Sequence, residues 1–418
     1  MFILPVIVSA LGVFLLIKLG FFPFRHPLKS ARICVGGMGN AGLKNLALAL
    51  AGTLGVGNIF GVAISITVGG AGSVLWLFLS GTFAAVIKYA EVLLCVDNSQ
   101  NGTGQGGMMY LLASKLRGGR FLGRLYAAIC LLLSLIMGAA MQSSAAVGSA
   151  EVILEIPRPF FAALFMILAF AFIFGRRERI KSITAVLVPL AAFCYILLTL
   201  TVIVRYYREI PRVIAEICAS ALTPRSAAGG VFGYLSVSPI VRGYSTGILS
   251  NEAGAGTSSM AHTSSEGADP VSSGLMGMCE VIADTAILCT LTAFAILLPQ
   301  SNISAISAAE LVTASLSLAF PKSEWLLLLS VSAFALATVV CWYFYGSVCS
   351  RYLFGRAADL VFLLLYAIGV LIGAVFDCSV FASLSDILLL ALTLLTLPVI
   401  IKSSDRIRTL SELSGLIN

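Results

Sequence analysis

The chain has 418 residues, of which 59% are hydrophobic and 11% charged, with a mean hydropathy of +1.02. A soluble domain carries about twice that fraction of charged residues, so the composition excludes an ordinary soluble protein. It predicts an all-α membrane protein, because unpaired backbone groups in hydrocarbon favour helices. The net charge is +7. We attribute it to the orientation of the protein in the membrane rather than to nucleic-acid binding, because Lys and Arg gather in the cytoplasmic loops of membrane proteins.

Eleven apolar segments approach the roughly 20 residues that a membrane-spanning helix needs. In chain order they are 2–20, 46–69, 72–96, 123–148, 159–175, 183–204, 229–250, 272–298, 325–349, 358–376 and 381–400. The first lacks a basic n-region and an A-x-A cleavage site, so we interpret it as a retained helix. We expect one transmembrane domain over residues 1–418, with an extra N-terminal helix at 2–20 and five-span blocks at 43–204 and 229–400.

The distribution of basic residues fits eleven spans with the N-terminus outside and the C-terminus inside. In that arrangement 18 of the 26 Lys and Arg residues fall in cytoplasmic segments and 6 in external ones. The remaining two, Lys88 and Arg242, fall inside spans. The excess on one side agrees with the positive-inside rule.

Two of the predicted spans are poor continuous helices. In the segment 46–69, Gly52, Gly55, Gly57 and Gly61 crowd around Asn58, and each interior glycine costs about 1 kcal/mol relative to alanine. In the segment 229–250, Pro239, Arg242 and Gly243 fall in mid-span. Paired breaks that each open a five-span block are typical of a transporter site at mid-membrane, although glycines also allow close helix packing.

Several sequence blocks resemble the alanine or glycine:cation symporter (sodium:alanine symporter) family. ALAGTLGVGNIFGVA (49–63), KYAE (88–91), SNEAGAG (250–256) and WYFYG (342–346) follow the family's motifs in the right order. The resemblance implies a leucine-transporter-like fold of two inverted five-helix repeats, here with one extra N-terminal helix. It also implies a multi-pass protein of a bacterial or archaeal cytoplasmic membrane that imports alanine, glycine or a similar small neutral amino acid with Na⁺.

The resemblance further implies which residues form the site. In the leucine-transporter-like fold a G-x-G-N motif at the first break contacts substrate and cation, which is matched here by Gly55, Gly57 and Asn58. Gln142 would hydrogen-bond the amino acid, unless it serves to hold neighbouring helices together. Trp342 would line the pocket and limit the substrate's size, unless it is an aromatic residue of the membrane interface. The implied Na⁺ ligands are the carbonyls of Ala51, Leu54 and Ala335 and the hydroxyl of Thr338, which otherwise bonds its own helix.

The second predicted break adds candidates of less certain role. Ser245 and Thr246 are candidate substrate contacts, and Thr246 stands where the family usually has Arg, which leaves a different small solute as an alternative. Arg242 would bind a substrate carboxylate, form a gate with an acidic residue, or extend its guanidinium group to the membrane surface. Glu252, in the SNEAGAG block, either belongs to an inner gate or simply follows the end of the seventh span.

Four more charged residues are expected inside the membrane. Lys88 and Glu91 are spaced i, i+3 and are interpreted as a structural ion pair or an inner gate. Glu280 and Asp284 are spaced i, i+4, and intramembrane carboxylates are candidates for carrying protons. Asp284 could equally accept hydrogen bonds from neighbouring helix ends. Proton-coupled symport therefore remains an alternative to Na⁺ symport.

Other classes of function lack their sequence signals. Ten cysteines and two histidines form no CxxC pair or metal-ligand cluster, and there is no P-loop for ATP-driven transport. No nucleophile–base pair indicates an enzyme, and no repeated filter motif indicates an ion channel. We expect no cofactor, Na⁺ as the coupling ion, and a small neutral amino acid and the lipid bilayer as partners.

Overall fold

The computed structural model describes residues 3–37, 39–100, 106–154, 157–174, 177–221, 239–264, 267–299, 308–376 and 378–417. Every regular element in these ranges is a helix, which confirms the all-α class. Among them seven helices are long and apolar enough to cross a membrane, and a bent pair makes an eighth span. The count of eleven stays a prediction, because two further apolar helices are shorter and much of the segment 229–250 lies outside the described residues.

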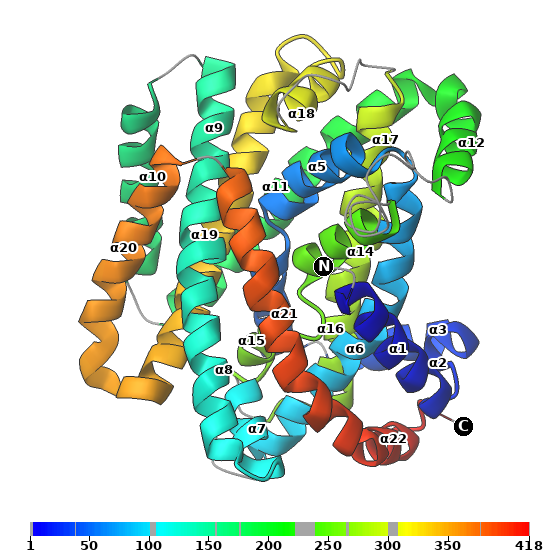
Figure 1. Ribbon diagram of the computed structural model, residues 1–418, viewed down its shortest axis with the longest axis vertical. Helices are drawn as coiled ribbons and strands as arrows, with labels where there is room; N and C mark the ends of the chain where they lie inside the picture. The colour runs from blue at the N-terminus through cyan, green and yellow to red at the C-terminus, as the bar shows by residue number, and fades with distance from the viewer. Residues whose placement is uncertain are drawn as a thin grey trace.

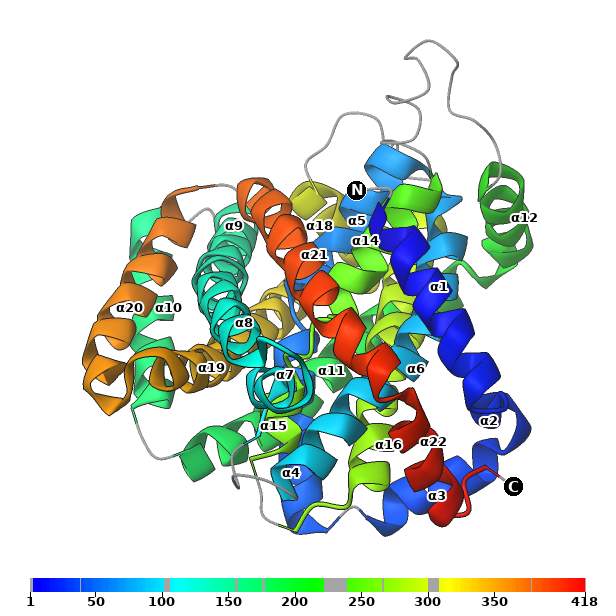
Figure 2. The ribbon, with the colours of Figure 1, turned by 60° about the horizontal axis from the view of Figure 1, so that its bottom comes forward.

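The N-terminal part packs on one flank of the molecule. It comprises α1 (Ile3–Lys18), α2 (Phe22–Arg25) and α3 (Pro27–Gly36). Figures 1 and 2 show these helices near the C-terminal helix α22 (Ser404–Leu413). Lys18 Nζ lies 2.5 Å from Asp405 Oδ1, and this hydrogen bond lowers the pKa of the Asp405 carboxyl. Because Asp405 is exposed, the pair adds little stability.

A broken helix and three long helices form the centre of the fold. The broken helix consists of α4 (Asn40–Thr53), the one-turn η1 (Val56–Asn58) and α5 (Phe60–Gly69), and its halves are bent by 55°. Beside it, α6 (Ser73–Gln100) packs along both α14 (Pro239–Asn251) and α16 (Pro270–Val281). The π-helical η5 (Ile282–Cys289) and α17 (Thr290–Leu297) continue α16 in the same direction.

A second group of helices encloses the centre. The elements α8 (Gly119–Leu133), η2 (Ser134–Met141) and α9 (Gln142–Leu154) run as one column, with α10 (Arg158–Ile173) and α20 (Asp359–Val375) outside it (Figure 1). The helices α11 (Arg177–Arg205) and α19 (Ser323–Phe354) pack together against α4. The last long helix, α21 (Cys378–Lys402), crosses in front of them (Figure 2).

The remaining elements are short connections. They are α7 (Met108–Lys115), η3 (Tyr207–Glu209), α12 (Ile210–Ala221), α15 (Ser259–His262), α18 (Ala308–Leu316) and η6 (Arg356–Ala358).

The part of the second predicted break at Gly243 is corrected by the structure. The chain is helical without interruption from Pro239 to Asn251, so Gly243 does not break the helix. A Cβ at Gly243 would lie 2.2 Å from Ser73 O, so this glycine instead allows α14 to approach α6 closely. The part of the predicted span before Pro239 lies outside the described residues.

Candidate functional site

The broken helix is interrupted at Leu54 and Gly55. We use the name first break for these two residues together with the turn that follows them as far as Asn58. The Gly55 N–H donates to Thr53 O at 2.9 Å and to Asn58 Oδ1 at 3.3 Å. In a continuous helix this N–H would bond to the carbonyl of Ala51, four residues earlier. The break therefore releases the Ala51 carbonyl and leaves polar backbone deep inside the protein, where such backbone is tolerated only if other groups satisfy it.

Side chains from two neighbouring helices supply those partners. Gln142 Oε1 accepts from the Val56 N–H at 3.3 Å, and Thr338 Oγ1 donates to Leu54 O at 3.4 Å. Trp342 Nε1 donates to Gly52 O at 3.2 Å. All three side chains are buried. The fold thus brings these predicted site residues, Gln142, Thr338 and Trp342, to the first break.

Gly55→Ala is expected to lower uptake about tenfold, since crowding a packed site costs about 1–3 kcal/mol. A Cβ at Gly55 would lie 3.0 Å from Thr338 Oγ1 and 3.1 Å from Gln142 Oε1. The measurement is initial uptake into proteoliposomes of radiolabelled alanine, the solute that the sequence resemblance implies. Gly39→Ala is the matched control, because nothing lies within 4 Å of a Cβ at this position just before the same broken helix. Equal uptake by both variants would contradict the placement of the site.

Asn58 links the first break to a buried carboxylate on η5. Its Nδ2 donates to Asp284 Oδ1 at 2.6 Å, and Ser250 Oγ donates to the same oxygen at 3.0 Å. Thr285 Oγ1 donates to Asp284 Oδ2 at 2.8 Å. Ser250 and Thr285 are functional candidates that the sequence analysis did not assign. The only signals for them are the SNEAGAG block, which begins with Ser250, and the position of Thr285 directly after Asp284.

Two π-helical segments flank the first break. η2 ends directly before Gln142, and Gln142 Nε2 donates to Met137 O within η2 at 3.3 Å. η5 contains Asp284. Such segments are rare and occur mostly at functional sites, where they displace a side chain from its regular helical position. Nothing in the sequence analysis predicted them.

The implied Na⁺ ligands lie on α4 and α19, beside the first break. Thr338 Oγ1 is 3.4 Å from Leu54 O and 2.9 Å from Phe334 O. Ala51 and Ala335 are fully buried on the same two helices. Hydroxyl and carbonyl oxygens are the ligands that hard cations prefer. The structure therefore places such oxygens between α19 and the first break.

A second interruption of helix lies at residues 252–258, directly after α14. Glu252 adopts a left-handed φ of +53° there, and the whole turn is buried. Glu91 Oε2 accepts from the N–H groups of Gly254 and Gly256 at 3.0 and 3.1 Å. Tyr126 donates its hydroxyl to Ala255 O at 2.7 Å. Side chains from other helices thus satisfy a buried turn in the SNEAGAG block, where one of the two interpretations of the sequence expected the seventh span to end.

The turn belongs to a group of buried ionisable residues that we call the charge cluster: Lys88, Glu91, Glu252, His262 and Glu280. Lys88 Nζ lies 3.3 Å from Glu91 Oε1, and the carboxylates of Glu252 and Glu280 also act on this ammonium. His262 Nε2 contacts Glu280 Oε1, and Thr257 Oγ1 donates to Glu252 Oε2 at 2.5 Å. Within the described residues, Glu252 Oε1 and Glu280 Oε2 have no hydrogen-bond partner.

The other residues predicted for the second break lie elsewhere on α14. Ser245 is buried, and the Thr246 methyl lies 3.6 Å from the Cβ position of Gly61 on α5. No recorded contact joins Ser245 or Thr246 to Asn58. Arg242 is in α14, but its side chain lies outside the described part of the structure. Ser250, one turn after Thr246, is the α14 side chain that reaches the first break.

Comparisons with known proteins agree with this arrangement. Residues 1–411 match the sodium:alanine symporter family. An uncharacterized transporter of Haemophilus influenzae is 30% identical, over 92% of this chain and 87% of its own. The sodium/alanine symporter AgcS of Methanococcus maripaludis is 27% identical, over 84% of this chain and 80% of its own. A solved Na⁺-coupled sialic acid symporter shares the fold, with a TM-score of 0.60 and 12% identity, over 100% of this chain and 86% of that one.

The family match and the sequence relatives show that the protein is a transporter and not an enzyme, and its long apolar helices agree with a multi-pass membrane protein. The match over nearly the whole length shows that the chain belongs to the sodium:alanine symporter family.

Proposed function

We propose that the protein imports a small neutral amino acid, of the alanine or glycine kind, by symport with Na⁺. One observation carries the proposal: Gln142, Thr338 and the amide of Asn58 all converge on the unwound backbone of the first break. Unwound backbone at this depth offers N–H groups to a carboxylate and carbonyls to a cation.

The substrate would bind with its carboxylate at the first break. The Val56 N–H that now donates to Gln142 is the donor that a carboxylate would take over, and charge-assisted hydrogen bonds are stronger than neutral ones. Gly57 would keep the backbone accessible, since only Ser250 lies within 4 Å of its Cβ position. Trp342 would limit the size of the substrate side chain, which favours alanine or glycine.

Na⁺ would bind between α4 and α19, to the carbonyls of Ala51, Leu54 and Ala335 and the hydroxyl of Thr338. The break supports this assignment, because it releases the Ala51 carbonyl from the helix. Binding of Na⁺ would also hold the two helices at a fixed separation. Because a ligand shifts a conformational equilibrium only through differential affinity, this contact would favour the closed form of the site.

The surrounding architecture would be two inverted five-helix repeats, at residues 43–204 and 229–400, with α1 as the extra helix of an eleven-span protein. Each block contains a buried interruption on its first helix, the first break and residues 252–258. The N-terminus would lie outside and the C-terminus in the cytoplasm, as the basic residues predict. Alternating access would move α4–α5, α6, α14 and α16 against the enclosing helices.

The charge cluster would act as the inner gate. Glu91 holds the turn 252–258 through two backbone N–H groups, so opening on that side would require these hydrogen bonds to break. Lys88 would hold the Glu91 carboxylate in place. Glu252, within the turn, would move away from Lys88 when the gate opens.

Proton coupling is the second candidate, and one observation favours it. Glu280 and Asp284 are buried carboxylates on consecutive turns of one span, and Glu280 contacts His262. These two carboxylates would be successive binding sites for a proton between the charge cluster and the first break. Asp284 would then serve as the residue whose charge a proton neutralises.

Uptake of radiolabelled L-alanine, D-alanine and glycine into proteoliposomes distinguishes these candidates. With an inward Na⁺ gradient, uptake should exceed that with choline, and Thr338→Ala should raise the Na⁺ concentration for half-maximal uptake about tenfold. Thr201→Ala is the matched control, because its hydroxyl also donates to a carbonyl of its own helix, at 2.7 Å, but on α11. Uptake driven by a pH gradient alone would contradict the Na⁺ assignment. Folded protein that takes up none of the three compounds would contradict the substrate assignment.

A further inference from the structure

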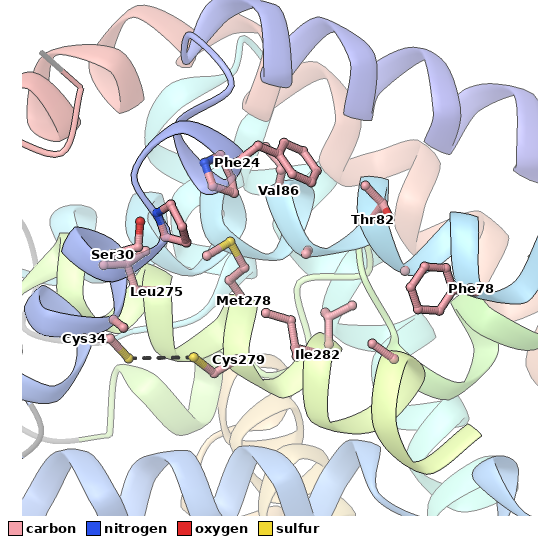
Figure 3. A pocket seen from close by; sticks show the side chains of 17 residues that line it. Phe24, Ser30, Cys34, Phe78, Thr82, Val86, Leu275, Met278, Cys279 and Ile282 are labelled. Carbon is pink, nitrogen blue, oxygen red and sulfur yellow. Dashed lines mark hydrogen bonds between the residues drawn. The ribbon is translucent and has the colours of Figure 1, made fainter. Parts of the chain in front are cut away.

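Two thiol groups from helices far apart in the sequence lie in contact on the N-terminal flank. Cys34 is on α3 and Cys279 is on α16, and their sulfur atoms are 3.8 Å apart. Figure 3 shows the two side chains pointing toward one another, with a dashed line between the sulfurs. Neither residue belongs to the first break or to the charge cluster, so the proposed transport mechanism does not use this contact.

The backbones of α3 and α16 approach closely beside these residues. Ser272 Oγ, on α16, donates to the Cys34 carbonyl at 3.4 Å. A Cβ at Gly37, directly after α3, would collide with the same Ser272 hydroxyl. A disulfide needs neighbouring backbones and an S–S distance of about 2.05 Å. The two sulfurs therefore have to approach by roughly 1.8 Å, which small rotations about the two χ1 angles supply.

The pair lies in an apolar groove that opens on the outside of the protein. The groove has a volume of about 290 Å³, and both cysteines line it together with residues of α2, α6 and η5. Phe24 and Phe78, which also line it, are 61 and 47% exposed. Cys279 is half-buried and Cys34 is buried. A small uncharged molecule that enters the groove can therefore reach the Cys279 thiol before the Cys34 thiol.

A second pair of thiols has a similar contact without the access. Cys130, on α8, forms a hydrogen bond with Cys349 on α19, and Cys349 Sγ lies 3.9 Å from Met260 Sδ. Both of these thiols are fully buried, and neither lines the groove. Because thiol oxidation depends on exposure, Cys130 and Cys349 should stay reduced under conditions that oxidise Cys279. They are an internal control within the same chain.

We propose that Cys34 and Cys279 are a site of reversible oxidation by peroxide, which joins α3 to α16 through a disulfide. The Cys279 sulfur attacks one oxygen of hydrogen peroxide, so an S–O bond forms, the O–O bond breaks, and the released hydroxide leaves as water with the thiol proton. The Cys34 sulfur then attacks the sulfenic acid: the S–S bond forms, the S–O bond breaks, and a second water leaves with the Cys34 proton. The two thiols lose two electrons, and the peroxide gains them.

The disulfide would fix the chain just before the broken helix. Because α3 directly precedes α4, a bond from Cys34 to α16 would hold the N-terminal helices against the helix that carries Glu280. The proposed topology places α3 on the cytoplasmic side, where small thiols keep cysteines reduced. The bond would therefore form during exposure to peroxide and be reversed afterwards by thiol exchange. The oxidation itself depends on neither the substrate nor the coupling ion, so its test needs no transport.

Mass spectrometry of the purified full-length protein tests the bond. The protein is treated with hydrogen peroxide, the remaining thiols are alkylated, and the peptides are analysed without reduction. A peptide with Cys34 should be joined to one with Cys279, dithiothreitol should separate them, and Cys130 and Cys349 should be alkylated. The oxidised protein should also have a Tm several degrees higher than the reduced protein, because the bond links residues 245 positions apart.

Single variants test the order of the two steps. In Cys34→Ser the sulfenic acid at Cys279 has no partner thiol, so dimedone, which reacts with sulfenic acids, should label Cys279. In Cys279→Ser the Cys34 thiol should stay unmodified. Neither variant should show a rise in Tm on oxidation. If Cys34→Ser does not fold, Cys34→Ala removes the same thiol.

Three results would overturn the proposal. One is the absence of a joined Cys34–Cys279 peptide at a peroxide concentration that oxidises glutathione added to the same sample. Another is oxidation of Cys130 and Cys349 to the same extent, which would mean that the groove gives Cys279 no advantage. The third is dimedone labelling of Cys34 in Cys279→Ser without labelling of Cys279 in Cys34→Ser, which would reverse the proposed order of attack.

Discussion

Asp284→Asn is expected to reduce Na⁺-driven alanine uptake about 100-fold or more while the protein stays folded. The side chain is fully buried, and its recorded hydrogen-bond partners, Asn58, Ser250 and Thr285, are all neutral. When ionised, it supplies a negative charge beside the break that a transported cation, a proton or the substrate ammonium can neutralise. Loss of one charged partner costs about 3 kcal/mol, or about two decades of affinity. Asparagine keeps the shape and one acceptor oxygen, so the packing should persist.

The control for this change is Asp359→Asn, which removes a carboxylate from an exposed pair with Arg351 at 2.7 Å. Both variants are compared in proteoliposomes with a Na⁺ gradient and, separately, with a pH gradient. If Asp284 carries a proton, the variant loses uptake driven by the pH gradient. Asp284→Asn protein with uptake within about threefold of the unaltered protein would show that this charge takes no part in coupling.

The first break was predictable because its signal is local. Four glycines and an asparagine within ten residues disfavour a continuous helix, and the structure breaks the helix there. The same reasoning failed at Gly243, because a glycine at a close helix contact resembles a helix breaker in sequence. The helix ends at Asn251, within the SNEAGAG block, as one of the two interpretations of that block expected.

The partners of the break could not be predicted from local patterns. Asn58 and Asp284 are 226 residues apart in sequence, and only the packing of η5 beside η1 brings them together. The π-helical form of η2 and η5 leaves no distinct mark on hydropathy or periodicity. The i, i+3 spacing of Lys88 and Glu91 predicted their ion pair, but not that Glu91 also binds the turn 252–258. That contact depends on the fold of the whole chain.

Lys88→Met is expected to destabilise the protein by about 3–5 kcal/mol, which is the range for removing one partner of a buried ion pair. Lys88 is fully buried and is the cation that faces Glu91, Glu252 and Glu280. Its loss leaves these carboxylates near one another without the ammonium. The measurement is the thermal unfolding midpoint Tm of the detergent-purified protein. Arg406→Gln, which opens the 2.7 Å pair with Asp97 near the surface, is the control and should lower the Tm much less.

A double-mutant comparison separates the charge of this pair from its packing. Glu91→Gln keeps an oxygen that can accept from the Gly254 and Gly256 N–H groups, so alone it should be milder than Lys88→Met. Lys88→Met/Glu91→Gln removes one carboxylate as well as the ammonium and should be more stable than Lys88→Met. If the double variant is instead as unstable as the sum of the two single ones, the Lys88 side chain contributes through packing. In that case the charge cluster would not hold the turn 252–258 closed by electrostatic attraction, and the proposed inner gate would have to rest on the hydrogen bonds of Glu91 alone.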